Sequence, residues 1–315
     1  MTANQEGFFK EIDKSKYGEN RQLRPLFLPR ILNKEAITKL SVDDDAFKES
    51  FEIFQKWAKL SESGKLKSRN EISLQGEFLA EVFGKGPGYT LFSDNLDTWE
   101  LEPQYSINGG TADGAIGHFS SSGIKNPVAV IELKRPSTNV DRDRSQGRTA
   151  VQQCWDYLND LPECQWGIVC NYVSFRLYHR NQTSRSYQLF VLDDLQNEDN
   201  FRQFYYLFQR DGLLELAIGQ PPRAEKLLKL STQQKEKVGD DLYKSYDENR
   251  AKMILHLMKS PHSKNLDQAI RITQKLLDRI IVVAFCEDRD LLESNSLDKA
   301  HNQIPPFAWG IFLIF

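Results

Sequence analysis

The chain lacks the features that mark cysteine-rich metal proteins, secreted proteins and membrane proteins. It has only four cysteines in 315 residues, none at C-x-x-C spacing, and three of them lie in apolar contexts typical of buried free thiols in a reducing compartment. Its five histidines show no metal-ligand spacing, although His118 shares a predicted strand with Asp113. The first residues are polar and acidic, and no apolar run reaches bilayer length. We therefore expect a cytoplasmic protein with no membrane partner.

A strong excess of charge of either sign is also missing. The formal net charge is −3, so any nucleic-acid surface must be a local patch rather than a global field. Several nucleotide and acyl-transfer motifs are absent too, because Gly84–Gly88 lacks the Gly-Lys-Ser/Thr of a P-loop and no Gly-x-Ser-x-Gly elbow or helicase ATPase signature occurs. The length and the 40% apolar content predict two domains with a proper core.

The most informative stretch is Asn126–Lys134, an apolar strand that ends in two charges. The run Val128–Ile131 predicts a strand buried on both faces. Glu132 and Lys134 follow directly, and side chains two residues apart in a strand share one face. Opposite charges at a strand end suggest a reactive site. The alternative is an ordinary ion pair on the surface.

A second carboxylate, Asp113, falls on the neighbouring strand of a predicted hairpin. Turn signals precede it at Asn108–Gly110 and follow it at Ser120–Gly123. Carboxylates on adjacent strands can offer hard oxygen ligands to Mg²⁺, which otherwise keeps waters and binds substrate phosphate. Lys134 could then serve the attacking water or stabilise the pentacovalent phosphate, while the metal acts as a Lewis acid. Together these residue types predict phosphodiester hydrolysis.

The segment after Lys134 predicts a basic loop followed by an amphipathic helix. Apolar residues recur at spacings of three and four between Val151 and Leu158, which indicates a helix packed on the sheet. The stretch from Lys134 to Arg148 contains five basic and two acidic residues. This excess of positive charge suits binding to a phosphate backbone, although a solvated loop is the alternative. The basic residues are Lys134, Arg135, Arg142, Arg144 and Arg148, and the acidic ones are Asp141 and Asp143.

Asp113, Glu132-x-Lys134 and Gln153-x-x-x-Tyr157 together resemble the PD-(D/E)xK nuclease domain of type I and type IIG restriction enzymes. The resemblance implies that Asp113 and Glu132 bind Mg²⁺ and that Lys134 is the catalytic lysine. It also implies that Gln153 and Tyr157 support the nuclease site and the positioning of DNA. The charge pattern of the loop predicts separately that Arg135, Arg142, Arg144 and Arg148 contact double-stranded DNA. Ala112 stands where the name of the motif has proline, a position at which many members vary.

The family also carries a glutamate on the helix that precedes the sheet. The stripe of Leu74, Phe78, Leu79, Val82 and Phe83 predicts such a helix, which Gly84 and the following glycines end. Two glutamates border this stripe. The resemblance implies Glu77 as the site residue, with Glu81 as the second candidate, and a plain helix surface is the alternative for both.

The predicted fold is an α/β, restriction-endonuclease-like mixed sheet flanked by helices and followed by an all-α connector region. We predict a charged, irregular segment at 1–45, a nuclease domain at 46–200, a helical connector at 201–300 and an apolar tail at 301–315. The predicted strands are 89–92, 99–107, 112–119, 127–134, 166–171, 175–179 and 187–193, and the longer predicted helices are 47–60, 224–258 and 264–286.

The segment Leu276–Leu292 is similar to the helical connector that joins nuclease to methyltransferase in type IIG enzymes, the alternative being a generic buried helix with a charged cap. The methyltransferase motifs themselves are absent, since Ile304-Pro-Pro-Phe307 lacks the asparagine that would bind the adenine. The chain ends within its most hydrophobic run, which favours a truncated or frame-disrupted chain over a terminal strand or helix packed into a core.

These patterns predict an Mg²⁺-dependent DNA endonuclease of a restriction-modification system, the N-terminal fragment of a type IIG-like enzyme. A methyltransferase or specificity domain or subunit would be the partner missing from the chain. Two alternatives stay open. One is a repair or recombination nuclease of the same fold, and the other is a non-catalytic DNA-binding or assembly remnant.

Overall fold

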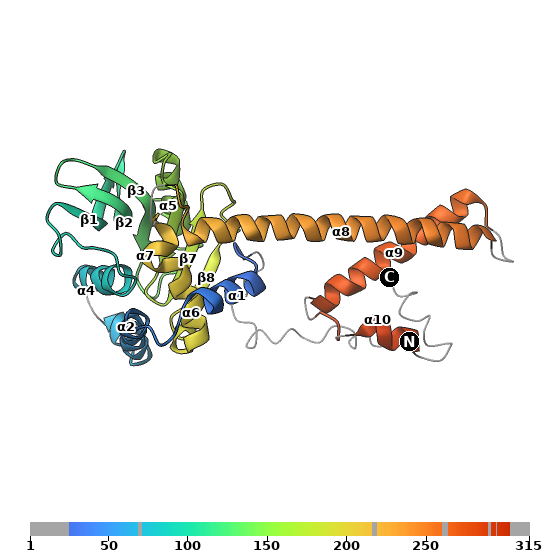
Figure 1. Ribbon diagram of the computed structural model, residues 1–315, viewed down its shortest axis with the longest axis horizontal. Coiled ribbons are helices and arrows are strands. Elements are labelled where there is room, and N and C mark those ends of the chain that lie inside the picture. The colour runs from blue at the N-terminus through green and yellow to red at the C-terminus, as the bar shows by residue number, and fades with distance from the viewer. Residues whose placement is uncertain are drawn as a thin grey trace. The chain divides into compact units, whose positions relative to one another are not determined.

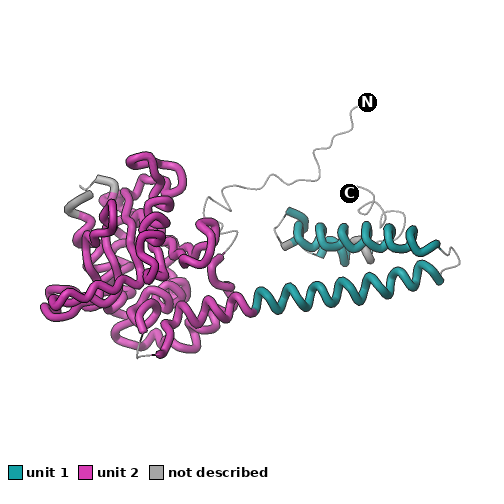
Figure 2. The backbone as a smooth tube through the Cα atoms, turned by 90° about the horizontal axis from the view of Figure 1, so that it is seen from above, with its two compact units in different colours: residues 1–21, 234–315 teal, residues 22–233 magenta. Residues whose placement is uncertain are grey.

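The computed structural model describes residues 25–68, 71–215, 219–259, 264–288, 291–293 and 295–302. Contacts divide the chain into two compact units, which are coloured in Figure 2. One unit is Gln22–Gln233, and the other comprises Met1–Arg21 and Gln234–Phe315. The boundary falls inside helix α8, Arg223–Lys259, so that one continuous helix contributes residues to both units.

The first unit is built on a six-stranded mixed sheet with helices on both faces (Figure 1). The strand order is β1-β2-β3-β6-β7-β8, and all neighbours are antiparallel except the parallel pair β3 and β6. A parallel pair needs a crossover, which helix α5 (Ala150–Asp160) provides. The strands are β1 (Thr98–Ile107), β2 (Gly110–Ser120), β3 (Lys125–Leu133), β6 (Trp166–Cys170), β7 (Ser174–His179) and β8 (Gln188–Val191), and a separate hairpin pairs β4 (Arg144–Ser145) with β5 (Arg148–Thr149).

Alternate side chains of the sheet feed two apolar cores, one on each face. In β3, Ala129 and Ile131 belong to the larger core, whereas Val130 belongs to the smaller one. This double burial explains why the sequence of β3 is a continuous apolar run. The larger core lies under α1 (Pro29–Lys39), α2 (Asp45–Glu62), α4 (Glu71–Phe78) and α6 (Glu198–Phe208), and the smaller core lies under α5. Shorter helical pieces are α3 (Lys65–Ser68), η1 (Leu79–Lys85), η2 (Asp194–Gln196) and α7 (Arg210–Leu213).

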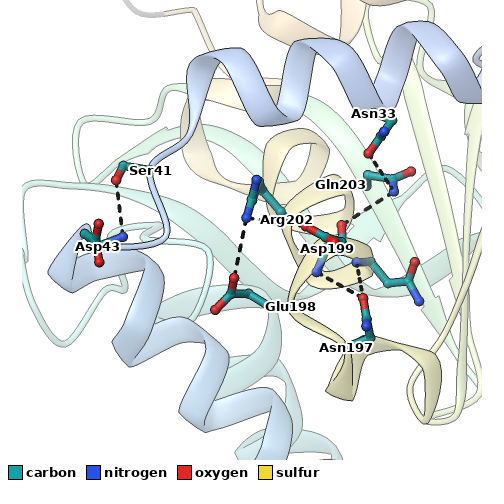
Figure 3. Close-up of polar contacts among 9 residues, drawn as sticks. Asn33, Ser41, Asp43, Asn197, Glu198, Asp199, Arg202 and Gln203 are labelled. Atoms are coloured by element: carbon teal, nitrogen blue, oxygen red, sulfur yellow. Dashed lines mark hydrogen bonds and ion pairs between the residues drawn. The ribbon is translucent and has the colours of Figure 1, made fainter.

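Helix α6 begins at a capped turn and contacts α1, as the close-up in Figure 3 shows. The side chain of Asn197 accepts hydrogen bonds from the backbone N–H groups of Asp199 and Asn200, each at 3.1 Å. These bonds satisfy two N–H groups that have no partner within the helix. One turn later, Gln203 Nε2 donates to Asn33 Oδ1 of α1 at 3.4 Å. A segment near the start of the described chain is thus fixed to the sheet unit.

The predicted mixed α/β sheet flanked by helices, followed by a helical region, is confirmed. Six of the seven predicted strands form. The prediction for 89–92 is wrong, because this segment contributes only an isolated bridge between Leu91 and Leu101. The chain reaches it from Gly88, whose φ of +83° belongs to a turn, and Phe92 is half-exposed.

One helix prediction also needs correction. The prediction of irregular structure at 1–45 is wrong for Pro29–Lys39, which forms α1. That helix starts with proline at its first turn and buries Leu32 and Ala36, four residues apart. The helix predicted before the glycines at 84–88 forms as α4 and the π-helix η1 that continues it, and it ends at Lys85, among those glycines.

In the second unit the described residues are helical. They form the remainder of α8, α9 (Leu266–Asp288) and α10 (Ser296–Asn302), so the two long helices predicted from the sequence are confirmed. Helix α9 buries Ala269, Thr273, Leu277 and Val283. Among the described helices, none is both long and apolar enough to cross a membrane. The apolar run 306–315 lies outside the described residues, as does the near-match at Ile304–Phe307.

Candidate functional site

Asp113 and Glu132 are brought together by the register of the β2–β3 hairpin. The antiparallel pairing matches Gly114 with Ile131 and Ala115 with Val130. The paired register ends at Gly114 and Ile131, so Asp113 and Glu132 stand at the first position beyond it. Asp113 is close enough to Glu132 for its charge to raise the pKa of that carboxyl. The site therefore lies where β2 begins and β3 ends. This is the hairpin predicted from the turn signals.

Glu132 is a buried carboxylate with a lysine as its ion-pair partner. It is 3% exposed, and Lys134 Nζ lies 2.5 Å from its Oε1. The backbone N–H of Lys134 donates to the carbonyl oxygen of Cys170 at 2.8 Å, which fixes the chain just beyond β3. The pKa of Glu132 is raised to about 7, chiefly by burial and next by the charge of Asp113, against the lowering effect of Lys134 and Arg148. Burial and the neighbouring negative charge of Asp113 therefore both favour the protonated form of Glu132.

Asp113 is held by hydrogen bonds to both of its oxygens. The backbone N–H of Leu133 donates to Oδ2 at 2.7 Å. Gln75 Nε2, on helix α4, donates to Oδ1 at 2.7 Å. One donor comes from the strand that carries Glu132, and the other comes from a helix more than thirty residues earlier in the chain. The carboxylate is therefore oriented by two different elements of the fold.

Glu77, the glutamate expected at the site, is placed elsewhere. Its Oε1 lies 3.5 Å from Lys56 Nζ of α2, and its side chain is 44% exposed. Glu81 binds the same lysine at 2.8 Å and accepts a hydrogen bond from Trp57 Nε1 at 2.8 Å. Both glutamates thus fasten η1 and α4 to α2. The residue of α4 that contacts Asp113 is Gln75, which the sequence analysis missed even though it borders the same apolar stripe.

Helix α5 carries Gln153 and Tyr157 and lies on the face of the sheet to which Val130 belongs. Glu132 shares that face by the two-residue period of the strand. Tyr157 is buried, and its hydroxyl donates to the carbonyl oxygen of Thr111 on β2 at 3.0 Å. Burial and the charges of Glu132 and Asp113 raise the pKa of Tyr157, so the phenol stays protonated and can donate. Gln153 is 7% exposed, and its Oε1 has no hydrogen-bond partner among the described residues. An unpaired buried acceptor is costly and marks a place where a donor or cation would be favourable.

The loop between β3 and α5 is held to the sheet by one of its acidic residues and braced internally by the other. Asp141 forms two hydrogen bonds of 2.8 Å with Arg176 of β7, one to each carboxylate oxygen. Asp143 accepts from the backbone N–H of Asn139 at 2.8 Å. Gln146 and Gly147, with φ values of +52° and +81°, then form the two-residue turn between β4 and β5. Both acidic side chains of the loop therefore have hydrogen-bond partners within the protein.

The four arginines predicted to contact DNA differ in their surroundings. Arg135, Arg142 and Arg144 are exposed. Arg148 lies 3.0 Å from Asp156 Oδ2 on α5 and is close enough to Glu132 to lower the pKa of that carboxyl. The charge of Arg148 thus acts directly on the site carboxylate Glu132.

The residues at the hairpin fit a hard divalent cation that keeps waters. Asp113 and Glu132 offer carboxylate oxygens, the donors that Mg²⁺ prefers, and their mutual repulsion would be relieved by a cation. Within the described ranges no cluster of three or more histidine, cysteine or acidic side chains could hold a metal. The two carboxylates would therefore need water or substrate oxygens to complete an octahedral shell, which is the usual mode for Mg²⁺.

The cysteines lie apart from metal chemistry. Cys154, Cys164 and Cys170 are buried free thiols, as predicted, and Cys286 is only half-buried. Burial raises the pKa of Cys164 to about 12 and keeps it a thiol. His118 is exposed on β2.

No family model, no curated protein and no solved structure matches the chain. The function is therefore argued from the geometry and chemistry of the hairpin site.

Proposed function

We propose that the protein is an Mg²⁺-dependent DNA endonuclease with a restriction-endonuclease-like fold. One observation supports this above all: two carboxylates, Asp113 and Glu132, lie close together at the ends of adjacent strands, with Lys134 Nζ 2.5 Å from Glu132 Oε1. The same three residues carry the resemblance to PD-(D/E)xK nucleases. The proposal treats the ion pair as part of a reactive site rather than as a structural contact.

Asp113 and Glu132 would hold the metal, and each of the remaining residues has a separate task. When bound, Mg²⁺ supplies a Lewis acid for the phosphoryl oxygen and positive charge against the two carboxylates. Lys134 keeps its ammonium at the end of β3, where it can orient the attacking water and stabilise charge that develops on the phosphate. Tyr157 fixes the backbone of β2 two residues before Asp113. Gln153 contributes a buried amide oxygen that has no hydrogen-bond partner in the described part of the chain.

The basic loop would receive the DNA backbone. Arg142 and Arg144 are exposed on a loop that Asp141 ties to Arg176, so their charges are offered by an anchored segment. Phosphate contacts of this kind fix register on a duplex without reading its sequence. With a net charge of −3 for the whole chain, such a local patch is the form that a DNA surface must take.

The biological setting that we propose is a restriction-modification system. The segment Leu276–Leu292 supports this, because its sequence resembles the helical connector of type IIG enzymes. A methyltransferase or specificity domain or subunit would then be the partner, and double-stranded DNA the substrate. A repair or recombination nuclease would act on branched DNA instead.

The test is cleavage of supercoiled plasmid, linear duplex and four-way junction DNA by the full chain, with Mg²⁺ or with EDTA. We expect Mg²⁺-dependent cutting of duplex DNA and a loss of at least about a hundredfold in Lys134→Ala, because a positioned charge at the phosphate is removed. Lys125→Ala is the matched control, since Lys125 is exposed at the opposite end of the same strand.

Equal cutting by Lys134→Ala and wild type would overturn the proposal. Exclusive cutting of junctions would favour the repair nuclease. Binding of DNA without Mg²⁺-dependent hydrolysis would favour a non-catalytic module.

A further inference from the structure

Helix α4 supplies a contact to the site that the proposed chemistry does not yet use. Gln75 Nε2 donates to Asp113 Oδ1 at 2.7 Å, a short distance for a bond from an amide nitrogen. Bonds to ionised acceptors are shorter and stronger than neutral ones. The other oxygen of Asp113 accepts from the backbone N–H of Leu133, which does not depend on the side chain at that position. Gln75 is therefore a side chain through which the sequence can control the orientation of this carboxylate.

The position of Gln75 is set by rigid packing. Its neighbours Leu74 and Phe78 are buried in the larger core, at 4% and 0% exposure. Helix α4 runs without interruption into η1, which Glu81 fastens to Lys56 and Trp57 on α2. A donor on such a helix has little freedom to move away from its acceptor.

Gln75 is uncharged, so it orients Asp113 without changing the net charge of the site. Asp113 and Glu132 bring two negative charges, and Lys134 brings one positive charge, so the three together keep an excess negative charge. A lysine or arginine at position 75 would cancel that excess and compete with a cation. An amide orients the carboxylate while leaving the charge unchanged.

We propose that Gln75 is a positioning residue that presents the carboxylate of Asp113 to a divalent cation. This role rests on the proposed function, because it assumes that the carboxylate pair binds the metal. Partners that orient a ligand in this way typically change metal affinity by about tenfold to a hundredfold when they are removed. The residue acts through Asp113 and does not touch substrate.

The experiment measures Mg²⁺ binding by calorimetry on the full chain without DNA, together with the melting temperature in EDTA. Gln75→Leu removes the donor and keeps a side chain of similar length. We expect its Kd for Mg²⁺ to rise roughly tenfold, while its melting temperature in EDTA changes little. Gln75→Glu adds a third carboxylate, and we expect it to keep or tighten Mg²⁺ binding and to lower the melting temperature in EDTA through repulsion with Asp113.

Gln196→Leu is the matched control. Gln196 Nε2 donates to Glu62 Oε1 at 2.8 Å, the same kind of bond from an amide to a carboxylate on an exposed surface of the same unit. We expect it to leave Mg²⁺ binding unchanged. Gln75→Asn serves as a second variant if the leucine variant does not fold, since it keeps the amide but is one methylene too short to reach Asp113.

Failure of the role proposed for Gln75 can be distinguished from failure of the proposed nuclease function. Unchanged Mg²⁺ affinity in both Gln75→Leu and Gln75→Asn, with normal binding by wild type, overturns the role of Gln75 and leaves the proposed function standing. If wild type binds no Mg²⁺, or if Asp113→Ala binds it as well as wild type, the carboxylate pair is not a metal site and both proposals fail. Weaker binding in Gln75→Leu alongside a normal control supports the role.

Discussion

Tyr157, on the helix that covers the smaller core, donates a hydrogen bond of 3.0 Å to the backbone carbonyl of Thr111, two residues before Asp113. Gly110 makes room for this contact, since a Cβ at that position would lie 3.3 Å from the tyrosine ring. The bond joins the crossover helix α5 to the strand that carries one carboxylate. Tyr157 thus holds the backbone of β2 in place close to Asp113.

Loss of this bond should affect activity more than stability. In Tyr157→Phe we expect the free energy of unfolding to fall by about 1 kcal/mol, because Thr111 is exposed and water can replace the lost donor. Cleavage should fall by on the order of tenfold, since a small displacement of β2 misplaces Asp113. Urea unfolding and plasmid-cleavage rates measure the two effects. Tyr243→Phe, at a tyrosine that is 72% exposed on α8, is the control, and an equal loss of cleavage there would contradict the interpretation.

The raised pKa of Glu132 predicts a pH dependence of stability in the absence of metal. Its pKa is about 7 in the folded protein against an ordinary value of 4.5, so between these values the folded state binds more protons than the unfolded state. Stability must then decrease as pH rises through this window, by on the order of 3 kcal/mol between pH 4.5 and pH 8. Glu132→Gln removes the titration, and we expect it to be more stable than wild type at pH 8 in EDTA.

Melting temperatures from pH 4.5 to pH 8 measure this difference. Adding Mg²⁺ at pH 8 should raise the melting temperature of wild type and leave that of Glu132→Gln nearly unchanged, because the variant lacks one of the two ligands. Parallel pH profiles for the two proteins in EDTA would show that Glu132 does not titrate in this range.

The anchoring of the basic loop can be separated from its charge. Asp141→Asn breaks the ion pair with Arg176, whereas Asp143→Asn keeps an oxygen that can accept from Asn139. Each change removes one negative charge from the same loop, so electrostatics alone would strengthen duplex binding in both, by less than about tenfold. If anchoring matters, Asp141→Asn binds more weakly than Asp143→Asn. Fluorescence anisotropy at two salt concentrations decides between these outcomes, and equal affinities would refute a role for the anchor.

The sequence carries the hairpin site because strands have a short and strict repeat. Glu132 and Lys134 share a face by the period of two. The turn signal at Ser120–Gly123 joins the strand of Asp113 to the strand of Glu132 and makes the two antiparallel. Those two local rules were enough to predict that the carboxylates meet. Likewise, the spacing of three and four in α5 was enough to predict a helix packed against the sheet.

The sequence pattern of α4 does not show which of its residues contacts Asp113. Gln75 and Glu77 both border the apolar stripe, but they are about 200° apart around a helix of 3.6 residues per turn. A rotation of the helix that places one of them at the site therefore points the other away from it. The rotation of the helix is set by the packing of Leu74 and Phe78 and by the π-helical continuation to Lys85, which the glycines at 84 and 86 conceal in the sequence. No local pattern contains that information.

The sequence by itself determined the strand that ends in Glu132 and Lys134, the hairpin with Asp113 and the helix of Gln153 and Tyr157, because each depends on backbone periodicity and turn chemistry within a few residues. Only the tertiary structure decided that Gln75 rather than Glu77 holds Asp113, and that Asp141 is bound by Arg176. Those contacts join residues more than thirty positions apart, and their partners are selected by how helices and loops pack on the sheet.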